Sequence, residues 1–475
     1  MNDTGKLIKN TTIYAIGDII PKIFGFITFP ILTNAIAPDE YGILNYINSI
    51  DIFLVAAGLL CLNTYYLVYY FRVGGDNEKR KLLGNLSIFI VFNYIIIALI
   101  LFIFGPSLFR LIGSKVDFYP YIAIGIATAF FSILTVLPSA LYRVKENPFP
   151  LTIINVIRGF LVMVLTILSV YLLEPNALNV LWARFIATAF FGMIFVYITF
   201  KNATFSINIT QLRHALAFSL PLVPATLATY LYSMFDKVLI EKYLTLSALG
   251  IYSTASTLAF LLNIISHGAY KAFEPHFFKT YGTPSFDSSF GKVRDILLFV
   301  VLMGGLFICG YSEEFLKIFS STQYESARYY IPMLTIGAVA SAMSLMYGTI
   351  VTARGKTKVA AVITIVGAIL SVVLDIILLR FWGIWAAAFV SMFSFIFLCY
   401  GNMLYAHVKV DHVRPLFGVF FASLSMYMMT FIVHVDTIVV SFIVKLLIII
   451  ISCFVIMLVL GLNIKKLIKS LINKS

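Results

Sequence analysis

Two charged residues and a proline interrupt an apolar stretch near the start of the chain. The segment GDIIPKIFGF, residues 17–26, holds Asp18, Pro21 and Lys22. An ionisable side chain near the centre of a bilayer costs at least ~2.5 kcal/mol, so it normally faces a partner or a water-filled cavity. Asp18 and Lys22 are four residues apart, hence on one helix face, with the acid N-terminal to the base. They are candidates for a binding site, and an internal pair that neutralises itself is the alternative.

Further charges lie deep in apolar segments of the first half of the chain, at Asp51, Arg158 and Arg184. Together with Lys22 and Asp18 they give three bases against two acids. This positive excess suits an anionic group, because charge-assisted hydrogen bonds are strong and Arg can bind oxyanions with two parallel bonds. For the arginines, hydrogen bonds to carbonyl groups of neighbouring helices are the alternative explanation.

Asp18 and Asp51 are also candidates for a coupling-ion site that takes a proton or a sodium ion. Burial makes the protonation of a carboxyl group responsive to the opening of a cavity. Later in the chain, His267, Lys271 and Glu274 follow a helical spacing. Lys271 is therefore a further candidate to meet an anionic group.

Prolines show where the helices that begin each half of the chain could bend. Pro21 and Pro30 lie in the first apolar stretch, and Pro221 and Pro224 lie in the seventh. Proline removes a backbone hydrogen bond and kinks a helix, which is tolerated in membranes where helices line a cavity. We expect these four prolines to be gate or hinge residues.

The composition requires that these residues be placed by membrane helices. Of the 475 residues, 61% are hydrophobic and 12% are charged, and the mean hydropathy is +0.98. Because a bilayer core of about 30 Å needs roughly 20 apolar residues per helix, the chain is predicted to be an all-α integral membrane protein. The predicted spans are fourteen, with centres near Phe24, Val55, Ile96, Phe130, Val162, Ala189, Thr226, Leu261, Val301, Gly337, Ile369, Phe389, Ser423 and Ile448.

The basic residues predict the orientation of these spans. With the N-terminus in the cytoplasm, 23 of the 34 Lys and Arg residues fall in inner loops and tails and 7 in outer loops. This bias places both termini in the cytoplasm. The net charge of +13 therefore mostly records topology, and a nucleic-acid-binding role is disfavoured. The four cysteines lie in apolar segments without paired spacing, so no metal site or disulfide is expected.

An internal repeat divides the spans at an offset of about 208 residues. EYGILNYINSI (40–50) aligns with ALGIYSTASTL (248–258), which places Gly42 on Gly250; LFRLI (108–112) aligns with FLKIF (315–319), and YRVKEN (142–147) with ARGKTK (353–358). Two six-helix lobes are thus predicted, with two C-terminal helices added. The expected boundaries are 1–203, a cytoplasmic link at 204–212, a second lobe at 213–408, and two spans with a basic tail at 409–475.

Several stretches resemble the polysaccharide transporter family of lipid-linked oligosaccharide flippases, which includes O-antigen and capsule-unit flippases. FPILTNAIAPDEYGILNYINSI (29–50) is similar to that family's first outer turn, and SLPLVPATLATYLYSMFDKVLIEKYLTLSALGIYSTAS (219–256) to its seventh and eighth spans. The resemblance covers the whole chain in span number and order, although its motifs are diffuse. It implies a two-lobed fold shared with multidrug and toxin extrusion (MATE) transporters and with lipid II flippases.

The resemblance also implies an activity. The substrate would be an undecaprenyl-pyrophosphate-linked sugar unit, moved from the cytoplasmic to the outer leaflet of the bacterial inner membrane by alternating access. The candidate pyrophosphate ligands are then Lys22, Arg158, Arg184 and Lys271. Polysaccharide polymerase and glycosyltransferase machinery are expected partners. We expect no enzymatic activity and no cofactor beyond a coupling proton or sodium ion. Because a nucleotide-binding motif is missing from the sequence, transport is expected to use an ion gradient or the substrate's own gradient and not ATP hydrolysis.

Two other functions remain open at this stage. A MATE-type exporter of cationic drugs would share the fold, but it predicts an apolar or acidic pocket, and the excess of deep bases argues against it. A membrane polysaccharide polymerase or ligase would need a large outer loop with catalytic residues, and the predicted outer loops are short.

Overall fold

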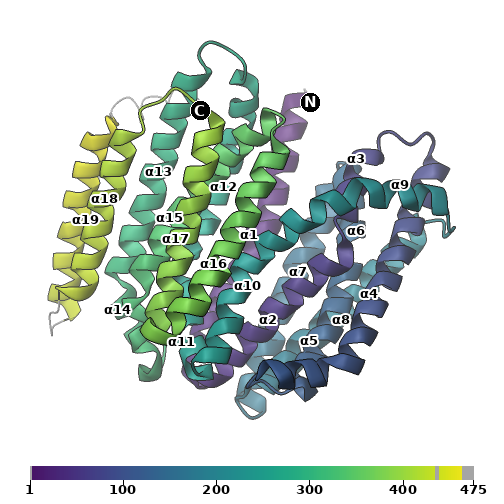
Figure 1. Cartoon of the computed structure of the whole chain (residues 1–475), viewed down its shortest axis with the longest axis horizontal. Helices are drawn as coiled ribbons and strands as arrows, with labels where there is room; N and C mark the ends of the chain where they lie inside the picture. The colour runs from purple at the N-terminus through teal and green to yellow at the C-terminus, as the bar shows by residue number, and fades with distance from the viewer. Residues whose placement is uncertain (1–2, 434–437, 463–475) are drawn as a thin grey trace. The chain divides into compact units, whose positions relative to one another are not determined.

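A computed structural model of the chain is drawn in Figure 1 and describes residues 3–433 and 438–462. Within these ranges, the side chains of residues 3–12, 14, 15, 18, 233, 269, 271–276, 278–280 and 438 lie outside the description. The described residues form helices joined by turns and loops, and they contain no strand. This confirms the predicted all-α fold.

Thirteen helices among the described residues are long and apolar enough to cross a membrane. A shorter apolar helix, Ile19–Ala35, lies at the position of the first predicted span. The multi-pass architecture predicted from hydropathy is therefore confirmed. The side of the membrane on which the termini lie stays a prediction.

The chain forms two compact units, Met1–Gly250 and Ile251–Ser475. The first unit contains α10, which the sequence repeat assigns to the second half of the chain. The predicted lobe boundaries at residues 203 and 213 remain a prediction based on the repeat.

Elements of the first unit begin at residues suited to helix starts. Pro38 and Pro148 occupy the first helical positions of α2 and α7, where proline's missing N–H costs nothing. Asn176 and Asn208 cap α8 and α9 by accepting a backbone N–H with their side chains. The bounds are α1 (Asp3–Ala35), α2 (Pro38–Leu59), α3 (Leu62–Tyr69), α4 (Asp76–Ile112), the π-helical turn η1 (Phe118–Ile122), α5 (Ala123–Leu134), α6 (Val136–Val144), α7 (Pro148–Leu172), α8 (Ala177–Asn202), α9 (Ile209–Ser219), the 3-10 turn η2 (Leu220–Leu222) and α10 (Val223–Tyr243).

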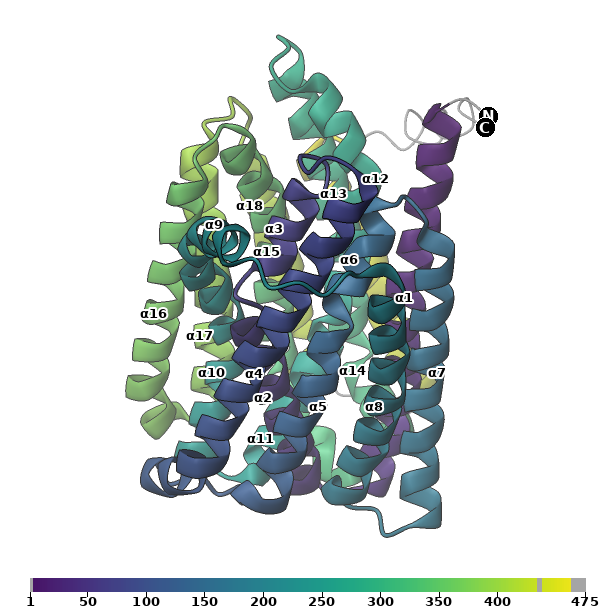
Figure 2. The same ribbon diagram turned by 90° about the vertical axis from the view of Figure 1, so that its right-hand side faces the viewer.

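Helix packing in the first unit places α2 at its centre. α2 contacts α4, α5, α8 and α10, while α1 packs along α7, as Figure 2 also shows. α11 (Leu246–Ala259) begins in this unit and crosses α2 at two glycines. A Cβ atom on Gly42 would meet the carbonyl oxygen of Leu246, and one on Gly250 would meet that of Pro38. The glycines that the repeat aligned therefore allow one close helix crossing.

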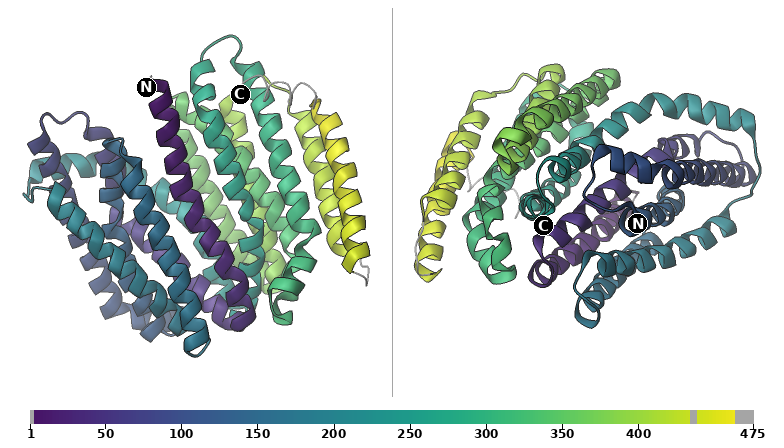
Figure 3. Two further views of the ribbon diagram at one scale, coloured as in Figure 1. Left: turned by 180° about the vertical axis from the view of Figure 1, so that it is seen from behind. Right: turned by 60° about the horizontal axis from the view of Figure 1, so that its bottom comes forward.

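The second unit is built around α15, which packs on α13 and α17. Its last two helices, α18 and α19, form a hairpin-like pair that Figure 3 shows in two orientations. The bounds are α12 (Leu261–Thr280), α13 (Phe286–Gly310), α14 (Ser312–Phe319), the 3-10 turn η3 (Thr322–Tyr329), α15 (Ile331–Ala353), α16 (Thr357–Trp382), α17 (Ile384–Ala406), α18 (Val413–Phe431) and α19 (Ile438–Leu460).

An ion-pair network joins α19 to α14 within the second unit. Lys445, in the middle of α19, is 1% exposed and lies 2.7 Å from Glu314 Oε1. Ser441 donates to the same carboxylate at 2.7 Å. The neighbouring Glu313 binds Arg328 at 2.6 Å and Lys317 at 2.8 Å. The lysine inside the fourteenth predicted span is thus neutralised by an acid from a short helix far away in the sequence.

Candidate functional site

The first predicted site segment runs along α7. A Cβ on Gly159 would lie 2.9 Å from the Pro21 side chain, and the rings of Phe24 and Phe160 are 5.8 Å apart. α1 continues as a helix through Pro21 and Pro30. Its Lys22 side chain is exposed.

The partner predicted for Lys22 is Asp18, whose side chain lies outside the described residues, as does that of Lys271. The Asp18–Lys22 pair and the role of Lys271 therefore stay predictions. Their backbones lie in α1 and α12.

Asp51 and Arg158 come together from two helices. Asp51 projects from α2 and Arg158 from α7, both partly buried, and their charges attract each other. The Oδ1 atom of Asp51 is buried and has no hydrogen-bond partner among the described residues. Tyr94 of α4 lies within electrostatic range of Asp51, and its hydroxyl donates to the Ile126 carbonyl at 2.7 Å. The site thus contains a carboxylate whose hydrogen bonding is incomplete.

Arg184 lies near a different part of α2 in the same unit. It projects from α8, partly buried, and interacts with Tyr41 of α2. Tyr41 and Asp51 are ten residues apart on α2, about 15 Å along the helix axis. The two predicted arginines therefore lie beside different parts of α2, Arg158 near Asp51 and Arg184 near Tyr41, and they do not form a single cluster.

The seventh predicted span is broken at the prolines. α9 ends at Ser219, a 3-10 turn covers residues 220–222, and α10 begins at Val223. Pro221 lies in the turn, and Pro224 lies in the first turn of α10. The break lies where a bend was expected: Pro221 is in the 3-10 turn, and Pro224 is at a helix start, where its missing N–H costs no hydrogen bond. The role of both prolines as hinges remains a proposal.

One buried acid of this unit was missed by the sequence analysis. Glu241 of α10 is 1% exposed and accepts hydrogen bonds from the loop that follows α4. Its Oε1 atom receives the Ser114 hydroxyl at 3.1 Å, the Val116 N–H at 3.2 Å and the Lys115 N–H. Lys115 also donates its side chain to the Leu244 carbonyl. Glu241 therefore clamps α10 to a loop that lies some 125 residues earlier.

α10 makes a second polar contact one turn before Glu241. The Lys237 ammonium donates to Ser49 Oγ of α2 at 3.1 Å. Lys237 lies near the predicted outer boundary of its span, where a structural role was favoured over a binding role. The only signal for this contact was the i, i+4 spacing of Lys237 and Glu241, which places both on one helix face.

The roles predicted for these residues, anion binding by Arg158, Arg184 and Lys22 and ion exchange by Asp51, stay predictions. The described residues contain no group of three His, Cys, Asp or Glu side chains placed to hold a metal ion.

Known proteins resemble this chain in sequence and in fold. A family model described as "Polysaccharide biosynthesis protein" matches residues 7–281, and a MatE model matches residues 221–377. A protein of the Lsg locus of Haemophilus influenzae is 25% identical over 284 residues, 58% of this chain and 66% of that protein. The alignment thus spans just under two thirds of that relative. An uncharacterized membrane protein of the same organism is 22% identical over 74% of this chain and 85% of its own length.

Solved structures share the fold at low sequence identity. The lipid II flippase MurJ in an inward closed conformation superposes with a TM-score of 0.76 at 13% identity, covering 94% of this chain and 98% of its own. An inward-facing multidrug resistance MATE transporter superposes with a TM-score of 0.63 at 14% identity, covering 88% and 98%. The predicted MATE-like fold is confirmed. With its family model matched over more than half its length, the chain belongs to the polysaccharide biosynthesis protein family of multi-pass membrane proteins.

Proposed function

We propose that this protein is a flippase for an undecaprenyl-pyrophosphate-linked oligosaccharide. It moves the repeat unit of an O antigen, capsule or exopolysaccharide from the cytoplasmic to the outer leaflet of the bacterial inner membrane by alternating access. The observation that carries the proposal is the pair of partly buried arginines, Arg158 and Arg184, inside spans of a polysaccharide-family chain. Membrane-embedded cations of this kind normally mark a substrate path.

The residues have separate roles in this proposal. Arg158 and Arg184, with Lys22 and Lys271, bind the pyrophosphate as it passes, and their spacing along α2 offers successive positions for one anionic group. Asp51 and Asp18 take the coupling proton or sodium ion. The incomplete hydrogen bonding of Asp51 supports this role, because an ion or proton would satisfy the buried oxygen. Pro21, Pro30, Pro221 and Pro224 absorb the bending of their helices.

The proposal is tested by deleting the gene in its host and measuring the sidedness of the lipid-linked sugar in membrane vesicles. Lipid-linked units stranded on the cytoplasmic side, with loss of surface polysaccharide, are expected. Complementation with Arg158→Ala, Arg184→Ala or Lys22→Ala should fail, whereas Arg110→Ala, a change at an exposed base of α4, should restore export. Normal export from all three variants would refute the cationic path.

A double variant separates substrate binding from simple charge neutralisation. Because Asp51 is also a proposed coupling residue, the readout is the binding of undecaprenyl pyrophosphate to purified protein and not export. If Arg158 only neutralises Asp51, then Asp51→Asn with Arg158→Gln should restore the binding lost in Arg158→Gln alone. If Arg158 binds pyrophosphate, the double variant should stay unable to bind, and we expect this result, with partial rescue by Arg158→Lys.

A drug exporter is the second candidate because the MatE model matches residues 221–377. It predicts a different phenotype for the deletion strain: unchanged polysaccharide and a new sensitivity to cationic drugs. Asp18 and Asp51 would then be the binding residues. The expected partners under the flippase proposal are the polymerase and the glycosyltransferases that act on either side of the flipping step.

A further inference from the structure

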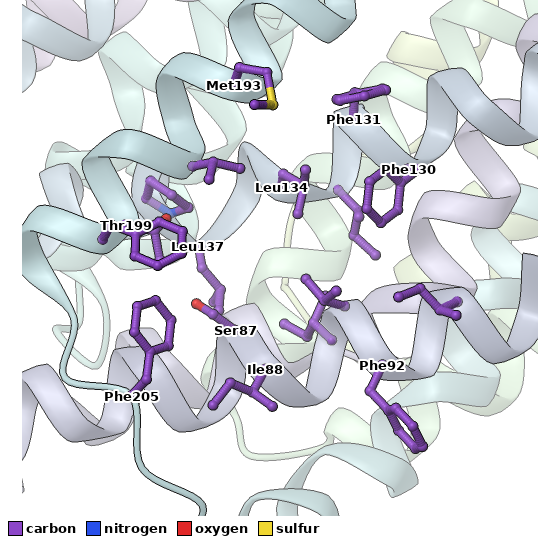
Figure 4. A pocket seen from close by; sticks show the side chains of 17 residues that line it. Ser87, Ile88, Phe92, Phe130, Phe131, Leu134, Leu137, Met193, Thr199 and Phe205 are labelled. Atoms are coloured by element: carbon purple, nitrogen blue, oxygen red, sulfur yellow. The ribbon is translucent and has the colours of Figure 1, made fainter.

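An apolar cavity of the first unit has none of the deep charged residues in its lining. It has a volume of about 720 Å³, within the range of about 300–1,000 Å³ common for ligand sites. α4, α5, α6 and α8 line it with apolar side chains, together with Phe205 from the segment after α8. Figure 4 shows Phe92, Phe130 and Phe131 toward one end and Ser87, Thr199 and Phe205 toward the other. The helices that carry Asp51 and Arg158 contribute none of its lining.

A small basic pocket lies one helical turn beyond the polar end of this cavity. It has a volume of about 230 Å³ and shares three helices with the apolar cavity. On each shared helix, about one turn separates a residue of the apolar lining from a residue of the basic lining. These pairs are Ser87 and Leu83 on α4, Leu137 and Leu141 on α6, and Thr199 and Asn202 on α8. The two pockets therefore lie next to each other along α4, α6 and α8, an apolar cavity followed by a charged one.

Three bases and one acid line the charged end. Arg80 donates to the Lys201 carbonyl at 3.2 Å, and Lys145 donates to Asn202 Oδ1 at 2.9 Å, so both meet neutral acceptors. Lys79 lies 4.9 Å from the centre of the Tyr70 ring and 4.0 Å from Asp76. The pocket keeps a positive excess, which suits a phosphate group.

Tyr70 adds a neutral donor to this end of the site. Burial, together with the charge of Asp76, raises the pKa of the Tyr70 hydroxyl above its ordinary value. The phenol therefore stays protonated at neutral pH and can donate to an anionic oxygen.

The internal repeat allows this cavity to be compared with the equivalent pocket of the second unit. In the second unit, the equivalent helices α13, α15 and α17 line an apolar pocket of about 220 Å³ that is also lined by Pro415, Leu416 and Val419 of α18. The additional helix thus occupies part of that groove. Among the described residues, those that line the cavity of the first unit belong to α4, α5, α6, α8 and the segment after α8, and no helix equivalent to α18 enters it. In a membrane, the occupant with this shape and polarity is a lipid.

We propose that this site holds an anionic glycerophospholipid, with an acyl chain in the apolar cavity and the phosphate against Arg80, Lys145 and Lys79. Basic pockets between transmembrane helices on the cytoplasmic side are suited to anionic headgroups. The site lies away from the proposed substrate path, and the lipid is a resident component that fills the groove. The proposed lipid site depends on the membrane fold and does not depend on the flippase activity.

The test measures lipid retention by the full-length protein in detergent, using native mass spectrometry with added phosphatidylglycerol or phosphatidylcholine. Phosphatidylglycerol should bind the parent protein more tightly. The double variant Arg80→Gln with Lys145→Gln should lose about tenfold in affinity for it, because each base near an anionic surface contributes measurably to binding. The matched control is Lys81→Gln, which removes the same charge from α4 at a residue that pairs with Glu78 at 2.7 Å and lies outside both linings.

A second pair of variants tests the apolar part of the site. Leu134→Trp fills the cavity and should release phosphatidylglycerol, whereas Leu99→Trp on the exposed face of α4 should not. Equal retention of the two lipids, or unchanged retention in the Arg80 and Lys145 double variant, would overturn the headgroup assignment. Competition by glycerol 3-phosphate at the affinity of the lipid would overturn the acyl-chain assignment. Preferential retention of undecaprenyl phosphate would identify the carrier lipid as the occupant and overturn the glycerophospholipid.

Discussion

Buried acids in this protein are stabilised in three different ways. Glu241 accepts two backbone N–H groups and a hydroxyl, and Glu314 pairs directly with Lys445. Asp51 has only the longer-range charge of Arg158 and an oxygen without a hydrogen bond among the described residues. The first two arrangements fix structure, because all their partners belong to the chain. The third leaves a bonding position open, which is what an exchangeable ion requires.

Replacing Glu241 should loosen the loop that it clamps. Glu241→Gln keeps an acceptor but removes the charge that strengthens these hydrogen bonds. The Lys115 and Val116 amides should then exchange with deuterium about tenfold faster, since hydrogen bonds to charged groups contribute ~1.5–3 kcal/mol. Hydrogen exchange with mass spectrometry checks this, with the exposed Asp117→Asn as the control. Unchanged exchange would mean that the clamp contributes nothing to the loop.

Removing the buried base of α19 should destabilise the second unit. Lys445→Met leaves the Glu314 carboxylate with the Ser441 hydroxyl but without its cation, and breaking a buried pair costs ~3–5 kcal/mol. The midpoint of thermal unfolding in detergent should fall clearly. Adding Glu314→Gln should recover part of the loss, whereas Lys358→Met, at an exposed base of α16, should have little effect.

The neighbouring Glu313 gives this network a defined pH dependence. Burial opposes its ionisation, but the hydrogen bond from Lys317 and the charges of Arg328 and Lys445 outweigh burial and lower its pKa. A lowered carboxyl pKa adds stability above the ordinary value of 4.5, and that stability disappears as the pH falls through the lowered pKa. Glu313→Gln should therefore lower the unfolding midpoint at pH 7, and its difference from the parent protein should shrink in acid below pH 4.5.

At the scale of helices, apolar length was sufficient to predict the all-α membrane architecture, and the prolines predicted the break around Pro221. α1 stays helical through Pro21 and Pro30, although these prolines were also expected to mark bends. The Glu241 clamp could not be predicted, because its partners lie in a loop without periodic pattern and far away in the chain. The Lys445 pair had a partial signal: a lysine inside an apolar span requires an acid, but Glu314 lies in the predicted second lobe (213–408) and Lys445 in the predicted C-terminal pair of spans (409–475). The spacing of Arg158 and Arg184 along α2 required coordinates, since sequence gives no register between helices.

The crossing of α2 and α11 should tolerate no side chain. Gly250→Ala would place a methyl group against the Pro38 carbonyl, and forced overpacking costs typically ~1–3 kcal/mol or more. Gly42→Ala should act in the same way against Leu246. Both variants should lower the yield of monodisperse protein in size-exclusion chromatography. Gly25→Ala, where a Cβ has open space, is the matched control and should behave like the parent protein.

For the whole molecule, the distribution of basic residues predicts which loops face the cytoplasm and which face the outside of the cell. The 23 to 7 bias of Lys and Arg places the loop between α7 and α8 outside the cell and the loop between α15 and α16 inside. In a background with the four native cysteines replaced by serine, Pro175→Cys should react with a membrane-impermeant maleimide in intact cells. Gly355→Cys should react only after permeabilisation. The reverse pattern would invert the orientation and the proposed direction of transport.

The glycine crossing also has a consequence for the ancestry of the chain. Gly42 and Gly250 occupy equivalent positions of the two repeats, and each lies against backbone presented by the other's helix. One ancestral glycine, once copied by gene duplication, would supply both faces of such a contact. A precursor with a single repeat would then use this glycine to associate with a second copy of itself. Gene duplication would join the two associated copies into one chain. A six-span polypeptide carrying this segment is a direct way to look for that ancient dimer.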